Sequence, residues 1–383
     1  MVPKIKHHAV NWIDGMKISK SHFAETNNFI YDQIRDGISL QLTNFNYGLL
    51  PPLSGEKTSL TFTVKETQSE KYKVSLSHCR AITHGGCRIE VLEGGEEISS
   101  TIEVAADIAK KGTGIFDVVL TVNPFVRVPA GTPNAEEQPP RHPFEKPLIE
   151  ISVVPTEQIK ATELGEHFII IGRLHYKSNE FVFDQRFIPA CTSIIAHPAL
   201  KTIYNTLGGY LNSIQSYSTN IVKKVLDNSQ DAGVALNVRL VCERLVYYTS
   251  ASFFSFRSML PQQSPIYVVE MFSRLANEAK VGINCLKEKD REELLNYFKE
   301  WTDLTPGQFM GMLDEVIDIE YDHNDCYDAL AKVDYMLSIL ASLLDKLNAL
   351  ELIGRKKERD IFVREKEIDK KPEKKKGFSM LDF

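Results

Sequence analysis

The sequence has no long apolar run and few cysteines. No stretch approaches the ~20 consecutive apolar residues of a bilayer-spanning helix. The basic residues at the start of the chain are followed by no apolar segment, so neither membrane insertion nor a secretory signal is expected. The six cysteines are scattered along 383 residues and make no disulfide framework. We expect reduced, mostly buried thiols in a cytoplasmic protein.

An excess of positive charge is also missing. The chain has 45 Lys and Arg residues against 51 Asp and Glu residues, a formal net charge of −6. Contacts to nucleic-acid phosphates need a basic surface, so nucleic acid is not an expected partner. Hydrophobic residues (43%) and charged residues (25%) occur at the levels of an ordinary globular protein, and the length favours two domains.

Sequence motifs for catalysis are absent as well. The chain has no Gly-x-Ser-x-Gly segment and no cysteine–histidine signature of a nucleophile with its base. Gly112 and Gly114 lack the third glycine and the strand–helix context of a phosphate-binding loop. We therefore predict a protein that is not an enzyme and holds no cofactor. The rival interpretation is a β-sandwich hydrolase with a helical appendage.

Two clusters contain residue types that bind metals. His78, Cys79, His84 and Cys87 offer four zinc ligands, but adjacent residues on a strand point to opposite faces. We therefore favour a strand–turn–strand with buried thiols. An acidic cluster over 314–328 lacks the central glycine and the closing glutamate of a calcium loop. We interpret it as a solvated helix face and predict no metal site.

The N-terminal half shows one helical pattern followed by many strand patterns. Apolar residues recur at helical spacing from Phe23 to Ile38, which predicts a helix over about 21–40 that Ser21 caps. Alternation with a period of two then predicts strands around 60–64, 72–76, 89–91, 116–122, 148–154 and 168–174. Short strands separated by turns indicate a β-sandwich. The proline-rich segment 124–147 is expected to be a long exposed loop.

Beyond residue 192 the pattern becomes helical. Apolar stripes occur over 200–211, 238–261, 268–276 and 330–347. They predict an antiparallel bundle, because each stripe can be buried against the others. At least one shorter helix is expected between 288 and 320. The segment 247–256 has too many aromatic rings for one helical face, so this helix is either wholly buried or partly covered by a second subunit.

These patterns predict a two-domain α+β protein with a tail. The β-rich domain spans 1–190, the antiparallel helical bundle spans 191–355, and a charged, flexible tail spans 356–383. The simpler interpretation of the tail is a segment exposed to solvent. The alternative is a docking peptide with four apolar anchors, Phe378, Met380, Leu381 and Phe383.

The opening segment, residues 10–23, resembles the start of the type VI secretion baseplate subunit family TssK. Members of that family begin with a Trp, an acidic residue, Gly-Met, an apolar residue and then His-Phe. The matching residues here are Trp12, Asp14, Gly15, Met16, Ile18, His22 and Phe23. Weaker matches are 187–189 with 199–200, and 264–267 with 275–276. The order of a β-rich domain and then a helical domain is also that of the family.

The resemblance implies a structural baseplate subunit of a contractile injection machine. Family members form homotrimers through their bundles, and their β-domains, which resemble phage receptor-binding proteins, bind the wedge subunits TssF and TssG. The expected location is the cytoplasmic face of the inner membrane. We predict that the wedge-facing surface consists of Trp12, Asp14, Gly15, Met16, His22 and Phe23. The alternative for its apolar members is core packing, and the alternative function is a phage-tail receptor-binding protein.

The chain departs from the family after the bundle. Typical members carry a third, C-terminal domain that docks on the membrane complex, whereas this chain stops in the charged tail 356–383. The resemblance is therefore to a divergent variant, such as those of Bacteroidetes-type systems. We expect the tail to replace the missing domain as a tether to a membrane-complex protein.

Overall fold

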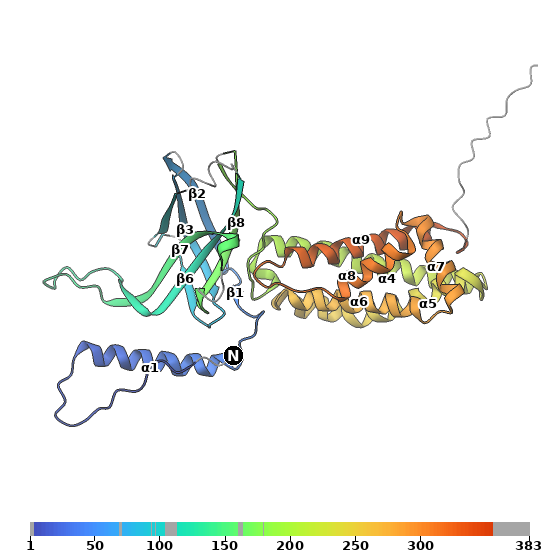
Figure 1. The fold of residues 1–383 in the computed structure, drawn as a ribbon. Coiled ribbons are helices and arrows are strands. Elements are labelled where there is room, and N and C mark those ends of the chain that lie inside the picture. Colours follow the sequence, from blue (N-terminus) through green and yellow to red (C-terminus); the bar gives the residue numbers. More distant parts are fainter. Residues whose placement is uncertain are drawn as a thin grey trace, which may run out of the picture.

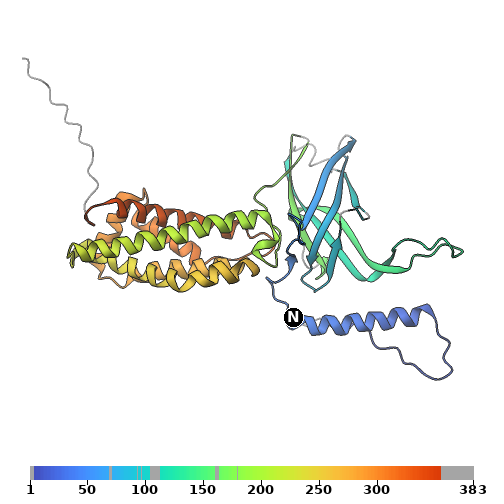
Figure 2. The ribbon, with the colours of Figure 1, turned by 180° about the vertical axis from the view of Figure 1, so that it is seen from behind.

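A β-rich half and a helical half lie end to end, and helix α1 lies alongside the β-rich half (Figure 1 and Figure 2). The computed structural model describes residues 4–68, 71–92, 94–95, 97–103, 113–159, 164–178 and 180–354. The predicted α+β class, with a β-rich part followed by a helical part, is confirmed. The tail anchors Phe378, Met380, Leu381 and Phe383 lie outside the described residues.

Helix α1 spans Lys20–Ser39, as the spacing of its apolar residues predicts. Its N-cap is Ser19 rather than Ser21, because the backbone of Ser19 is still extended. The backbone N–H of Ser19 donates to Nδ1 of His22 at 3.1 Å, so a side chain in the first turn satisfies a group that the helix leaves unpaired.

Two antiparallel sheets form the β-rich half. In the first sheet, β3 (Lys71–Ile82) pairs with β1 (Gly48–Leu49), β2 (Leu60–Gln68), β4 (Arg88–Val91) and β5 (Ile98–Glu103). The second sheet has the order β7-β6-β8-β9, with β6 Thr113–Ala130, β7 Phe144–Pro155, β8 Phe168–Lys177 and β9 Glu180–Phe183. Alternate residues of both sheets, such as Val74, Leu76, Val118 and Leu120, are fully buried in one hydrophobic cluster. The predicted strands are confirmed.

The proline-rich segment is a loop only in its middle, 131–143, because both of its ends belong to strands, so the prediction for 124–147 was wrong in extent. Strands β6 and β7 run into it as a long arm that projects beyond the sheets, with register partners from Arg127↔Pro147 to Ala130↔Phe144 (Figure 1). Residues 131–143 connect the two strands and contain one isolated bridge, between Asn134 and Arg141. The ladder shifts register after Asn123, whose side-chain oxygen accepts from the backbone N–H groups of two following residues. This local side-chain bonding allows strand pairing to resume beyond Pro124.

The helical half contains the four predicted apolar helices: α4 Pro198–Asp227, α5 Gly233–Phe254, α6 Ile266–Asn284 and α9 Tyr327–Ala349. The region expected to hold at least one shorter helix holds α7 (Glu288–Trp301) and α8 (Pro306–Ile317). The apolar stripe of α9 is buried from Leu330 to Leu347. The stripes of the four long helices therefore cover one another, which is what a bundle requires.

The connection between α8 and α9 joins the two halves. His323 donates from Nε2 to the carbonyl of Tyr47 at 2.9 Å. Arg173 of β8 lies 2.8 Å from Asp117 and 2.7 Å from Asp325. The interpretation of the whole acidic cluster as a solvated helix face was therefore wrong, because 318–326 is a connection and Asp325 serves as an ion-pair partner. This network ties the sheet to the bundle.

Candidate partner-binding surface

Helix α1 is attached to the N-terminal strap (residues 4–7) through charged groups. Oδ2 of Asp32 accepts from the backbone N–H groups of Lys6 and His7, each at 2.8 Å. Arg35 lies 3.2 Å from Asp32 and donates to the carbonyl of Lys4 at 3.2 Å. Asp32 is 0% exposed and Arg35 is 4% exposed. Buried charges need partners, and the strap supplies them on the inner face of α1, where the ring of Tyr31 also packs 5.4 Å from that of Phe125.

The opposite face of α1 is apolar and exposed. We define the α1 apolar face as Phe23, Ile30, Ile34 and Ile38, which are 59%, 48%, 55% and 38% exposed. Their spacing of seven and four residues places them on one side of the helix. Single exposed apolar residues are ordinary, but several on one side of a helix make that side a candidate interaction surface.

The opening segment extends this surface beyond the helix. The indole of Trp12 lies 6.3 Å from the ring of Phe23 and 5.8 Å from that of His22, measured between centroids. Trp12 is 49% exposed. The structure therefore brings together three of the predicted site residues at the start of α1. Core packing is wrong as an account of Trp12 and Phe23, which remain largely in solvent.

The other predicted site residues lie in the turn between Trp12 and the helix. Asp14 and Gly15 are exposed, and Met16 is half-buried. The backbone N–H of Met16 donates to the carbonyl of Ile13 at 3.2 Å, which closes the turn. Gly15 has φ of +79°, a conformation that residues with a Cβ rarely adopt. Glycine at this position is thus required by the turn that presents Trp12.

Sequence reasoning missed Ile30, Ile34 and Ile38 as members of the surface. Their spacing predicted a helix, but spacing alone does not tell which molecule covers the apolar side. The sequence did contain one signal, the placement of the charged residues Asp32 and Arg35 on the other side of the same helix. In the described part of the chain, these two are the only buried residues of α1.

A second exposed apolar row lies on the bundle. We define the α5 stripe as Leu240, Tyr247 and Phe254, spaced by seven residues and 38%, 77% and 70% exposed. The aromatic segment is therefore not wholly buried. Phe256, which follows α5, is buried and stacks on Tyr204 with centroids 4.2 Å apart. The rings of this segment thus divide between the core and the surface.

The residues considered for zinc lie in β3 and in the turn between β3 and β4. His78, Cys79 and Cys87 are buried, and burial raises the pKa of the Cys79 thiol to about 12 and raises that of Cys87. Over the described ranges, no three His, Cys, Asp or Glu side chains are grouped as metal ligands. In the same ranges, no helix has both the length and the apolar character needed to cross a bilayer.

No protein-family model matches the chain, and no curated protein sequence matches it either. Solved structures do match. The fold is similar to a "Crystal structure of TssK" with 16% identity and a TM-score of 0.50, over 86% of this chain and 68% of that one. It is also similar to a chain of "The baseplate complex from the type VI secretion system" with 14% identity and a TM-score of 0.51, over 89% of this chain and 100% of that one.

A further structure, "Structure of TssK from T6SS EAEC in complex with nanobody nb18", matches with 12% identity and a TM-score of 0.47, over 82% of this chain and 95% of that one. At identities this low, the two matches with TM-scores of 0.50 and 0.51 show a shared fold and no more. The chain is TssK-like in fold, and the resemblance seen in the opening segment is confirmed at that level.

Proposed function

We propose that this protein is a structural, non-enzymatic subunit of a type VI secretion baseplate and that it works by binding other proteins. The observation that carries the proposal is the α1 apolar face, which is exposed along a helix in a chain with the TssK fold. Covering apolar surface is favourable by about 25 cal/mol per Å², before the costs of association are subtracted. Such a surface serves assembly and needs no catalytic cleft.

The α5 stripe supports self-association into a homotrimer, with three bundles packed about a common axis. Rows of apolar residues at a spacing of seven are typical of helices that pack along their length. Large aromatic side chains such as Tyr247 and Phe254 contribute strongly to contacts between subunits. In this arrangement the bundles are central and the β-rich halves project outward.

The opening segment and the α1 apolar face bind TssF/TssG-like wedge proteins in this proposal. The tail, 356–383, tethers the assembly to a membrane-complex protein at the cytoplasmic face of the inner membrane. The proposed boundaries place the β-rich domain at 1–190 and the bundle at 191–355. The surface for wedge proteins then belongs to the first domain, and the surface for self-association belongs to the second.

Paired substitutions test the wedge surface. Ile30→Asp with Ile34→Asp places two charges on the α1 apolar face, and both positions are exposed, so the subunit still folds. We expect at least a tenfold loss of affinity for purified TssF/TssG-like protein, with unchanged native mass. The matched control is Leu226→Asp, at an exposed apolar position of α4. Full wedge binding by the double variant would contradict the proposed surface.

A further inference from the structure

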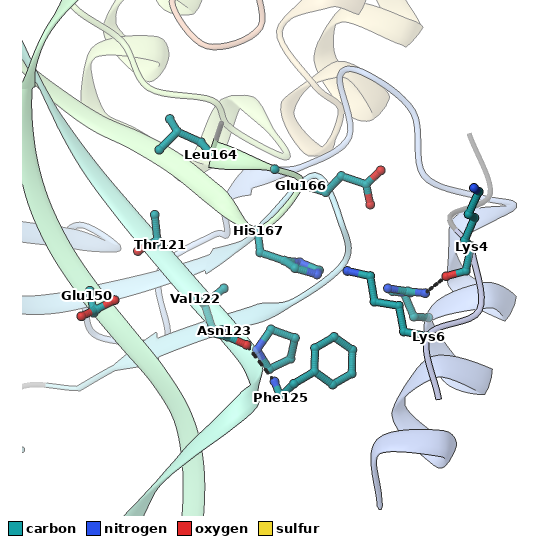
Figure 3. Close-up of a pocket in the computed structure, with 13 residues that line it drawn as sticks. Lys4, Lys6, Thr121, Val122, Asn123, Phe125, Glu150, Leu164, Glu166 and His167 are labelled. Atoms are coloured by element: carbon teal, nitrogen blue, oxygen red, sulfur yellow. Dashed lines mark hydrogen bonds between the residues drawn. The ribbon is translucent and has the colours of Figure 1, made fainter. Parts of the chain in front are cut away.

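A cavity of about 610 Å³ opens between the N-terminal strap, helix α1 and the second sheet (Figure 3). The buried polar groups in its lining are already engaged or enclosed. Arg35 pairs with Asp32 and donates to the carbonyl of Lys4. The ring of His167 lies against Gly85, where an added Cβ would come within 2.6 Å of it. The cavity therefore offers a ligand fewer free groups than the outer edge of strand β2 does.

The edge strands of the two sheets differ in how they are protected. An unpaired edge exposes a row of backbone N–H and C=O groups, and proteins usually protect it by shortness, prolines or a covering element. Strands β4 and β9 have four residues each, β7 contains Pro147 and Pro155, and β5 lies beside β7. Strand β2 has nine residues and no proline, and the described residues pair it with β3 alone. Of these edges, that of β2 is therefore the least protected.

The hydrogen bonds around β2 show which of its backbone groups face outward. The carbonyl of Thr61 accepts from the hydroxyl of Ser77 in β3 at 3.2 Å, so this carbonyl faces β3. The N–H and the carbonyl of Leu60 bond instead to the side-chain hydroxyl of Thr58, each at 3.2 Å. Backbone groups of successive residues in a strand point to opposite sides. The even-numbered residues from Leu60 to Glu66 therefore turn their N–H and C=O groups away from β3.

We define the β2 edge as the outward backbone groups of Phe62, Val64 and Glu66. No hydrogen bond to these N–H and C=O groups occurs within the described part of the chain. Phe62 and Val64 are half-buried, although their side chains pack against the hydrophobic core. Their register partners on β3, Leu76 and Val74, are fully buried. The extra exposure of β2 therefore falls on its open side.

The β2 edge selects an extended polypeptide. Its three N–H and three C=O groups repeat about every 6.8 Å, twice the rise per residue of an antiparallel strand. A second strand presents donors and acceptors at the same repeat. The ring of Phe183, which is 37% exposed, lies 5.3 Å from that of Phe62, measured between centroids. Apolar side chains on the inner face of an added strand would cover both rings.

The charge of the outer face narrows the class of partner. Exposed Lys65 lies directly opposite Lys73 of β3. Lys73 has Glu97 at 4.0 Å, whereas Lys65 has no ion-pair partner in the described ranges. Like charges directly opposite each other are unfavourable, and an opposite charge on a neighbouring strand offsets the cost. Glu66 follows Lys65 in the strand and so points to the other face. A strand added beside Lys65 is therefore favoured when it carries an acidic residue there.

We propose that the β2 edge binds an extended acidic segment of another protein, which adds to the first sheet as a further strand. Its apolar residues face Phe62 and Phe183, and its carboxylate lies beside Lys65. The site uses no residue of the α1 apolar face or the α5 stripe. The tests of wedge binding and of self-association can therefore fail without affecting this proposal, and the reverse also holds.

Amide hydrogen exchange of the full chain, resolved at single residues, tests the open edge. The amides of Phe62, Val64 and Glu66 should exchange rapidly, whereas those of Thr63 and Lys65, which pair with β3, should exchange slowly. The probe is acetyl-Thr-Val-Glu-Val-Thr-Val-Thr-amide, whose glutamate falls opposite Lys65 in an antiparallel pairing. At ten times its dissociation constant, the probe should slow the three outward amides about tenfold. The same peptide with N-methyl groups on its valines should have no effect, because it cannot donate to the β2 edge.

Charge exchange tests the acidic character of the partner. Lys65→Glu should weaken binding of the probe about three- to tenfold and should strengthen binding of the peptide that has lysine in place of glutamate. Lys65 is exposed, so this variant keeps the fold. Lys201→Glu, at an exposed position of α4, is the matched control and should change neither affinity. Val64→Pro removes one outward N–H and leaves the ladder to β3 intact, so it should weaken binding of both peptides.

Three outcomes would overturn the proposal. The first is slow exchange at Phe62 and Val64 in the free chain, which would mean that the edge is already covered. The second is the absence of protection at millimolar peptide, or equal protection by the glutamate and lysine peptides. The third is a lower native mass of Lys65→Glu without any peptide, which would make a second copy of this chain the occupant. If Val64→Pro unfolds, the charge exchange at Lys65 decides the matter.

Discussion

Helices α9 and α1 carry the same kind of apolar pattern, but the pattern is buried in α9 and exposed in α1. In α9 the row from Leu330 to Leu347 is at most 4% exposed, whereas in α1 Phe23 and Ile34 are 59% and 55% exposed. The bundle supplies other helices to cover α9. In the described residues, α1 contacts the strap through Asp32 and Arg35 and the sheets through Tyr31, and most of its other side is exposed. Helical spacing therefore predicts a one-sided helix, and the surroundings decide whether its apolar side is core or interface.

The largest effect is expected in α9. Leu337→Ala removes a fully buried side chain, and large-to-small changes in cores cost about 2–5 kcal/mol because a cavity remains. We expect a loss of about 3 kcal/mol in the free energy of unfolding, measured by urea denaturation. A loss below about 1 kcal/mol would show that α9 is no better covered than α1.

The next effect concerns the joint between the halves. Arg173→Met leaves Asp117, which is 2% exposed, without its ion-pair partner. Removing one partner of a buried pair costs about 3–5 kcal/mol, and the partial exposure of Arg173 reduces this to about 2–3 kcal/mol. Urea denaturation measures the loss. The control is Arg88→Met, which removes an exposed ion pair with Glu90. Equal stability of the two variants would contradict the role given to the junction.

The third effect is smaller, depends on pH and arises in the bundle rather than in α1. Burial lowers the pKa of His197, the N-cap of α4, to about 4. The unfolded chain, with a pKa near 6.5, then binds more protons, so stability is lost as pH falls from about 6.5 towards 4. We expect a loss of about 1–2 kcal/mol between pH 7 and pH 5. His197→Asn places a side chain that is favoured at an N-cap and should remove this part of the pH dependence. An unchanged pH dependence would contradict the burial of His197.

The smallest effect is expected on α1 itself. Ile34→Ala removes apolar atoms that are already largely in water, so the subunit should lose less than about 0.5 kcal/mol. The comparison with Leu337→Ala uses the same denaturation experiment. A loss of several kcal/mol at Ile34 would mean that α1 is covered within the subunit, against the account of its apolar face.

Much of the fold was predictable because local spacing determines it. Strands such as β3 alternate largely between buried and half-buried residues, and the long helices of the bundle show continuous stripes. The arm of β6 and β7 was not predictable from its prolines, because a register shift and the side chain of Asn123 allow pairing to continue. The role of Asp325 depends on Arg173, 152 residues earlier in the chain.

The candidate surface was predictable only in part. The motif drew attention to Trp12, His22 and Phe23, which do lie together. The rest of the α1 apolar face was not identified, because exposure depends on which partner groups the fold brings to each side of the helix. The cavity that Lys6, Arg35 and His167 line was not predicted for the same reason, since these residues come from three separate segments. Binding of wedge proteins by these residues stays a prediction.

The native mass of the purified full chain tests the central claim, that exposed apolar rows are covered by assembly, most directly. Light scattering after size exclusion at micromolar concentration should give a mass near three times 43.4 kDa. Tyr247→Glu with Phe254→Glu should return a folded protein of 43.4 kDa, because both residues belong to the α5 stripe. A wild-type mass of 43.4 kDa under the same conditions would contradict the account.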